Sequence, residues 1–233
     1  MTKVLFSCIF ILLTSSSFGQ FVITISGGYA GYKLDDLKQL NYEIRSTFPV
    51  EVRTVNDFPS RYYPEIKVGK RFKNITFGLG YSFHSTGSKL DYKDYSGEIY
   101  VKQITTMNSV GPFADISVNP SNKLKLKLSI GLYGAFTDLK LEEKIQVYNS
   151  QTADNYKFHA NSFIIQPAIE ISYPVLKCEV SIFLGSAIDT SGAYFYSEEN
   201  SNIYLSGNNK AKTNWSGIRT GISFSYILNS NHN

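Results

Sequence analysis

The clearest candidate for covalent chemistry in this sequence is a histidine with serines close on both sides. Ser82 lies two residues before His84, and Ser85 follows it directly. A histidine beside a hydroxyl can act as a general base that activates the oxygen as a nucleophile, provided that a third group orients the ring. No aspartate or glutamate can be assigned to that third role from the sequence. We therefore interpret His84 as a polar structural residue and assign no catalytic residue.

Patterns that hold metals or nucleotides are absent from the sequence. The histidines His84, His159 and His232 are far apart, and the chain has no CxxC, no HExxH and no glycine-rich phosphate loop. Cys8 lies in a leader described below, so Cys178 would have no intramolecular disulfide partner. We expect no metal site and no cofactor.

The N-terminus has the organisation of a secretory signal peptide. Lys3 supplies a positive charge, residues 4–13 are apolar, and Ser17 and Gly19 are the small residues that precede a cleavage site. The apolar run is too short to cross a hydrocarbon layer of ~30 Å as a helix. We therefore predict a signal peptide over residues 1–19.

Two other interpretations of this leader are an uncleaved anchor and a lipoprotein signal that uses Cys8. Cys8 lies inside the apolar run, whereas a lipoprotein cysteine follows it, so the second interpretation is weak. We expect residues 20–233 to form one domain. The length suits a single domain of about 200 residues.

The composition favours β-strands. Charged residues make up 18% of the chain, against roughly 25% in an average soluble domain. The chain has 17 tyrosines and 16 phenylalanines, and residues of this kind are enriched in strands. No segment after the leader has the long apolar run of a helical membrane span.

Eight segments alternate between apolar and polar or small residues. The clearest is 123–137, where leucine, isoleucine and phenylalanine occupy one parity and lysine, serine, glycine and tyrosine occupy much of the other. Because successive side chains of a strand point to opposite faces, each such strand has one apolar face. The predicted strands are about 21–32, 61–72, 75–84, one that ends at 118, 123–137, 162–173, 179–188 and 217–228.

The connections between these strands are alternately short and long. The short ones are 73–74, 119–122 and 174–177, and the long ones are 33–60, 85–97, 142–160 and 190–213. Short turns at one end and long loops at the other are typical of an outer-membrane β-barrel. We predict an all-β fold, an eight-stranded antiparallel up-and-down transmembrane β-barrel with both termini on the periplasmic, short-turn side.

A secreted lipocalin-like barrel is the alternative, with its apolar face turned inward around a ligand. The other face of these strands decides between the two, because glycine, serine and alanine dominate it and its charges nearly balance. Small residues and paired charges fit the interior of a narrow barrel better than a surface in water. The charged residues on that face are Glu65, Lys67, Arg71, Asp115, Lys125, Lys127, Glu170, Glu179 and Arg219.

The chain resembles the small outer-membrane β-barrel proteins of Bacteroidota type and, more loosely, the OmpA/OmpX-like barrels. The resemblance rests on the junction Ser17-Phe-Gly-Gln20, the eight alternating strands and the spacing Gly78-Leu-Gly-Tyr81. It implies a location in the bacterial outer membrane. Two further phrases look like family features without matching an active-site motif, Asp57-Phe58-Pro59 and Tyr92-Lys-Asp-Tyr-Ser-Gly97.

Two features of the long connections point to a role at the surface. Leu34, Leu37, Leu40 and Ile44 have near-helical spacing, which predicts a short helix over 34–44 at the rim of the barrel. Tyrosines, which are common in binding surfaces, are frequent in these connections. They also fit strands that continue past the membrane. They are Tyr92, Tyr95, Tyr148, Tyr156, Tyr194, Tyr196 and Tyr204.

We expect a monomer with a structural or surface-binding role, surrounded by outer-membrane lipid and able to bind an extracellular ligand or protein through its long loops, with no nucleic-acid partner. The alternatives are a lipid A-modifying barrel enzyme that uses His84, a small channel and the lipocalin-like barrel. Eight strands enclose an interior that side chains just fill, which argues against a wide pore.

Overall fold

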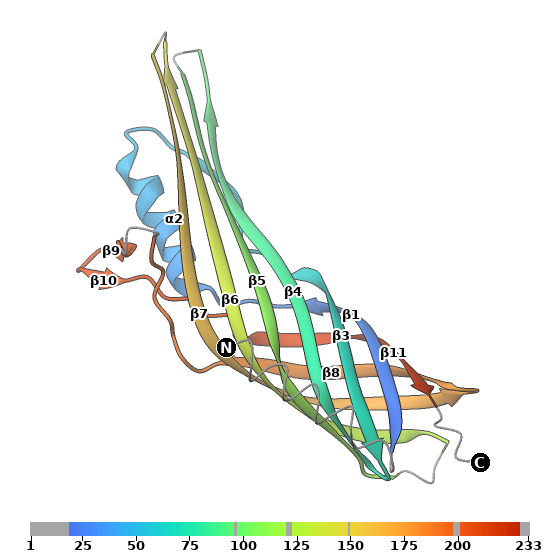
Figure 1. Ribbon diagram of the computed structural model, residues 1–233. Helices are drawn as coiled ribbons and strands as arrows, with labels where there is room; N and C mark the ends of the chain where they lie inside the picture. Colours follow the sequence, from blue (N-terminus) through green and yellow to red (C-terminus); the bar gives the residue numbers. More distant parts are fainter. Residues whose placement is uncertain (1–18, 96, 120–122, 149, 198–200, 229–233) are drawn as a thin grey trace.

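Eight strands form a closed antiparallel ring in the computed structural model, as the alternation predicts (Figure 1). The structure describes residues 19–95, 97–119, 123–148, 150–197 and 201–228, so nearly all of the predicted leader and most of the 119–122 turn lie outside the described residues. Each strand of the ring pairs with the next, and the last pairs with the first. The strands in ring order are β1 (Gln20–Ala30), β3 (Arg61–Phe72), β4 (Ile75–Lys93), β5 (Gly97–Ser117), β6 (Lys125–Val147), β7 (Ser150–Val175), β8 (Cys178–Asp189) and β11 (Gly217–Leu228).

The predicted strand ends are accurate within about two residues on the short-turn side, and on the other side they are wrong for β4, β6 and β7, which extend well beyond the predicted ends. Segments 85–97 and 142–160, predicted as loops, are mostly strand, since β4 and β5 pair as far as Lys93 and Glu98, and β6 and β7 pair as far as Val147 and Ser150. The side chains in these extensions no longer alternate between apolar and polar, so the sequence pattern ends where the apolar face ends. The backbone ladder continues because each strand still has a neighbour.

The apolar faces of the ring point outward. Phe77, Leu128 and Ile182 are 44%, 47% and 65% exposed, whereas the alternate positions Thr76, Lys127 and Ser181 are buried. A lipocalin-like barrel requires the opposite arrangement. Outward apolar faces on a closed ring identify a transmembrane barrel.

The height of the apolar surface matches a bilayer. The outward-facing apolar row that begins at Leu124, directly before β6, extends along this strand to Phe136. At about 3.3 Å per residue and a tilt of about 40°, this row covers about 30 Å along the barrel axis, which is the thickness of the hydrocarbon core.

This apolar belt ends at one level across β4 to β7. The last row that contains phenylalanine is formed by the paired residues Phe83, Asn108, Phe136 and Asn161. The next outward-facing row is polar and consists of Ser85, Thr106, Asp138 and His159. The change from apolar to polar side chains on one continuous sheet marks the boundary of the bilayer on this side.

Beyond this boundary β4 to β7 continue as a four-stranded sheet that leaves the ring (Figure 1). A short strand, β2 (Arg53–Asp57), pairs with β4 along its outer part. Helix α2 (Asp35–Thr47) lies against one face of this sheet, and a small hairpin of β9 (Tyr204–Leu205) and β10 (Asn209–Lys210) lies beside the helix. We call the sheet beyond the boundary, together with β2 and α2, the platform.

The predicted helix over 34–44 is confirmed and is slightly longer. Asp35 and Asp36 lie in its first turn, where negative charge favours the helix dipole. Leu37 and Leu40 are buried on the side that faces the barrel mouth and the sheet. Within the described ranges, no helix is both long and apolar enough to cross a membrane.

The belt can be tested with an arginine at its centre. Ile130 lies midway along the outward apolar row of β6 and is 47% exposed. Because Ile130→Arg places a guanidinium in hydrocarbon, we expect the free energy of unfolding to fall by about 2–4 kcal/mol in lipid vesicles, measured by urea titration.

Gln146→Arg is the matched control, because Gln146 lies on the same face of β6 beyond the boundary. It should change the free energy of unfolding by less than about 0.5 kcal/mol. Equal effects of the two substitutions would contradict the assignment of the belt.

Candidate functional site

The lumen of the barrel holds a network of charged side chains centred on Glu179. Arg71 donates two hydrogen bonds to the two carboxylate oxygens, at 2.9 and 2.8 Å. Lys125 and Lys127 donate to the same carboxylate, each at 2.8 Å. The side chain of Glu179 is 1% exposed, so three cations surround one buried anion.

The other lumen carboxylates also have partners, and the lumen is nearly full. Glu170 lies 3.5 Å from Lys127, Glu65 lies 3.8 Å from Lys67, and the Ser129 hydroxyl donates to Asp115 at 2.6 Å. The cavity among these residues has a volume of about 20 Å³, which is room for about one water molecule. The lumen thus has the narrow, side-chain-filled interior predicted for eight strands.

His84 faces inward above this network, as its parity predicts, and is fully buried. Its Nε2 lies 3.0 Å from the Ser82 hydroxyl, which also lies 2.7 Å from the Ser109 hydroxyl. The structure therefore brings together the serine and histidine that the sequence singles out. The hydroxyl of Tyr32 lies 3.2 Å from His84 Nδ1.

The third group beside His84 is a cation. Arg219 Nη1 lies 2.6 Å from Nε2 and 3.0 Å from Nδ1 of the ring, and the guanidinium lies 5.4 Å from the centre of the Tyr63 ring. A general base becomes positively charged as it takes the proton, and a neighbouring guanidinium opposes that charge. Among the described residues, no hydrogen bond or ion pair joins His84 to a carboxylate, so the group that orients the ring here is a guanidinium.

Apolar side chains close the mouth of the barrel above His84. Trp215 is fully buried, its ring packs edge-on against Tyr32 at 5.0 Å, and its Nε1 donates to the Thr137 hydroxyl at 2.9 Å. Leu34 and Leu37 at the start of α2 pack into the same cluster. The helix and the segment before β11 therefore seal the lumen on the platform side.

A buried amide fixes α2 to the platform. Asn41 is 3% exposed and donates to Asp57 of β2 at 2.8 Å and to Ser88 of β4 at 2.6 Å. Its carbonyl oxygen accepts a hydrogen bond from Gln103 of β5 at 2.8 Å. One side chain thus ties the helix to three strands.

Two carboxylates of α2 hold the segment that contains the β9–β10 hairpin. Glu43 accepts hydrogen bonds from the Ser206 backbone N–H at 3.1 and 3.0 Å, and Asp36 accepts one from Lys212 at 2.8 Å. Hydrogen bonds from Gln39 and then Ser206 hold the pKa of Glu43 below its usual value. These hydrogen bonds attach the segment that contains the hairpin to the helix.

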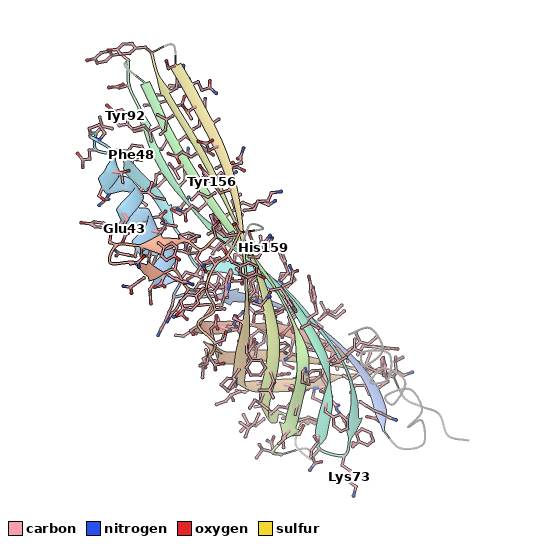
Figure 2. All side chains as sticks on the ribbon, turned by 60° about the vertical axis from the view of Figure 1, so that its left-hand side comes forward. Glu43, Phe48, Lys73, Tyr92, Tyr156 and His159 are labelled. Carbon is pink, nitrogen blue, oxygen red and sulfur yellow. The ribbon has the colours of Figure 1, made fainter. Side chains whose placement is uncertain are left out.

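An apolar cluster joins the platform sheet to the chain that follows α2. Val52, Leu90 and Val101 are buried there, and Phe48 and Tyr92 pack against them. Figure 2 shows Phe48 and Tyr92 on the same side of the sheet, and Lys73 at the opposite end of the molecule. The sheet beyond the boundary therefore has a packed apolar core of its own.

The predicted loop tyrosines do not form one patch. Tyr95 and Tyr148, at the tips of the β4–β5 and β6–β7 hairpins, are 97% and 73% exposed. Tyr156 lies on β7, and Tyr194 lies under the ammonium groups of Lys210 and Lys212. The interpretation of these tyrosines as residues of continuing strands fits Tyr92 and Tyr156.

One pair of polar residues at the boundary was not predicted. His159 Nδ1 lies 2.6 Å from Asp138 Oδ1, on the outward face of β6 and β7 (Figure 2). The two residues are 21 positions apart, and only the strand register places them opposite each other. The sequence did not reveal this pair because His159 lies in the segment 142–160, which was predicted as a loop, and Asp138 lies just after the predicted strand 123–137.

Along residues 150–158 of β7, no strand of the described part of the chain pairs with the side that faces away from β6, so the platform sheet has an open edge there. Residues 150–158 pair with β6 on one side, whereas β8 pairs with β7 only from Ile164 onward. The N–H and C=O of His159 both bond to Tyr196, away from β6. Because backbone groups alternate along a strand, those of Lys157, Asn155 and Ala153 point to the same open side. An open strand edge is a template for another strand.

No family model and no curated protein sequence matches this chain. Among solved structures, the chain is similar to Neisserial surface protein A at 11% identity and a TM-score of 0.40, over 90% of this chain and 96% of that one. The attachment invasion locus protein Ail of Yersinia pestis is 9% identical with a TM-score of 0.34, over 90% and 98% of the two chains. The outer membrane protease OmpT from Escherichia coli is 12% identical with a TM-score of 0.37, over 90% and 96%.

The lumen network can be tested at Glu179. Glu179→Gln leaves Arg71, Lys125 and Lys127 buried without their shared anion. Because a buried charge that loses its partner is costly, we expect the free energy of unfolding to fall by about 3–5 kcal/mol, measured by urea titration in detergent micelles.

The control is Glu98→Gln, which removes a platform carboxylate that lies 3.8 Å from both Lys93 and Lys144. These pairs are partly exposed, so the cost should stay below about 1 kcal/mol. A loss at Glu179 as small as that at Glu98 would show that the lumen charges are not coupled.

Proposed function

We propose that this protein is a bacterial outer-membrane β-barrel protein that holds the platform at the cell surface, where the platform binds a partner. The observation that carries the proposal is the boundary row at Phe83 and Phe136, where the outward face changes from apolar to polar while the strands continue. The belt anchors the protein in lipid, and the platform projects into water.

The predicted signal peptide and the position of the turns support the orientation. The short turns at 73–74 and 176–177 lie at the end opposite the platform, and β1 begins and β11 ends at that same end. In outer-membrane barrels the short turns face the periplasm. The platform then lies outside the cell, and both ends of the barrel domain are periplasmic.

A structural or binding role fits the geometry better than transport or catalysis. The filled lumen and the sealed mouth oppose a channel, and the guanidinium beside His84 opposes a lipid-modifying enzyme that uses this histidine. We propose that the protein acts as a monomer, because its ring closes within one chain.

Cysteine labelling on intact cells tests the orientation. We expect a Tyr95→Cys variant in a Cys178→Ser background to react with a membrane-impermeant maleimide, because Tyr95 is 97% exposed at a platform tip. Lys73→Cys, at the opposite turn, is the control and should react only after the outer membrane is permeabilised. The reverse pattern would place the platform in the periplasm and refute the proposal.

We further propose that the open edge of β7 is where the platform binds an extended polypeptide. Strand addition supplies main-chain hydrogen bonds to the partner, and neighbouring side chains supply specificity. Tyr156 lies on the strand that carries this edge and is 47% exposed, so its ring is available to a bound strand.

Proline at an outward-pointing N–H tests this mode of binding. Asn155→Pro removes one edge donor and leaves the ladder to β6, because the N–H of this residue points away from β6. Peptides selected on the wild-type protein from a phage-displayed library should bind Asn155→Pro at least about tenfold more weakly, measured by biolayer interferometry.

Asn155→Ala is the matched control, because it removes the same side chain and keeps the N–H. It should bind the selected peptides like the wild type. Unchanged binding to Asn155→Pro would refute strand addition at this edge.

A further inference from the structure

The wall of the barrel has a gap where β3 separates from β4. The pairing of β3 with β1 continues to Arg61, which lies opposite Ala30. The pairing of β3 with β4 already stops at Glu65, which lies opposite Ser82. The first four residues of β3 are therefore held by β1 alone, and β4 is free to diverge from them towards β2.

A groove of about 600 Å³ opens on the outer surface at this gap. Three cations line it, Arg61 of β3, Lys89 of β4 and Lys102 of β5, together with Tyr62 and Tyr100. None of the described residues that line it is acidic. The groove is thus a concave, positively charged site with aromatic side chains at its walls.

The three cations differ in how far they are neutralised. Lys89 forms an ion pair with Asp91 at 2.9 Å and lies 4.9 Å from the centre of the Tyr100 ring. Lys102 lies 3.8 Å from Glu142. Arg61 has no ion pair with any residue that the structure describes. Two carboxylates, Asp91 and Glu142, therefore face three cations, which leaves one net positive charge at the groove.

The groove lies directly beyond the apolar belt. Its residues Ser85 and Gly87 are the next outward-facing positions of β4 after Phe83, which belongs to the last apolar row. Tyr62, which is 83% exposed, packs edge-on against Tyr29 of the belt at 5.2 Å. Tyrosines of this kind lie at the level of lipid headgroups in membrane barrels.

An occupant of this groove needs two chemical properties. Its charged part must be an anion that accepts hydrogen bonds from a guanidinium and two ammonium groups, and phosphate has the oxygens and charge to do so. Its remaining part must be apolar, because the surface below the groove is the belt. A phosphorylated lipid has both properties.

We propose that the groove formed by Arg61, Lys89 and Lys102 binds the phosphate groups of an outer-leaflet lipid, whose acyl chains lie against the belt beside Phe83. The proposal rests on the membrane orientation given above. It assigns a specific lipid site to one sector of the barrel, between β3 and β5.

The test compares two variants that lose the same charge. Lys89→Gln with Lys102→Gln removes two groove cations. Lys140→Gln with Lys157→Gln removes two exposed lysines of β6 and β7, which face each other in the register row that also contains Gly87 and Ile104 of the groove. The control pair therefore has the same height and outward direction but lies outside the groove.

Each refolded protein is titrated in detergent micelles with lipid A that carries both phosphates, with the dephosphorylated lipid and with inorganic phosphate, and binding is measured by native mass spectrometry. We expect the groove variant to bind the phosphorylated lipid at least about tenfold more weakly and the control variant to bind it like the wild type. The dephosphorylated lipid and inorganic phosphate should bind at least about tenfold more weakly than the phosphorylated lipid.

Equal losses in the two variants would overturn the proposal, because binding would then follow net charge. Binding of inorganic phosphate as tight as that of the lipid would also overturn it and indicate a free-anion site. In every outcome a heat-modifiable band on a gel shows whether the barrel itself is folded, so a failure of the lipid site is distinguishable from a failure of the membrane assignment.

Discussion

The structure depends on satisfying backbone hydrogen bonds where no water is available. A strand in hydrocarbon cannot leave its N–H and C=O groups unpaired, so the sheet must close on itself. The pairing of β11 with β1 achieves this closure, and the belt lies on the part of the sheet that is closed. Beyond the boundary row water can satisfy an edge, and there the ring opens into the platform.

Closure has a consequence for the interior. An eight-stranded ring is narrow, so inward-facing charges are removed from water and must neutralise one another. Glu179 of β8 receives Arg71 from β3 and both Lys125 and Lys127 from β6, two strands that are distant from each other in sequence. The network therefore couples opposite walls of the barrel, and the small residues between its members leave room for the long cationic side chains.

The platform uses a different source of stability, because it stands outside lipid. Its sheet is covered on one side by α2 and the chain that follows it, through an apolar cluster around Leu90 and Val101. Asn41 fixes the position of α2 on the sheet, since its buried amide forms hydrogen bonds to residues of β2, β4 and β5. The open β7 edge and the groove at β3 both lie where a neighbouring strand ends, so both candidate sites arise from the same unequal strand lengths.

The sequence by itself determined the strands, their inward and outward faces, and helix α2. A period of two residues for a strand or of about 3.6 for a helix is a local property, and the apolar positions reveal it. It also placed His84 and Glu179 in the lumen by parity. Only the tertiary structure decided that segments 85–97 and 142–160 are paired strands, that Arg219 lies beside His84, and that Asp138 meets His159. Each of these depends on which strand lies next to which and in what register, and polar alternation carries no signal of either, since water accepts polar side chains on both faces.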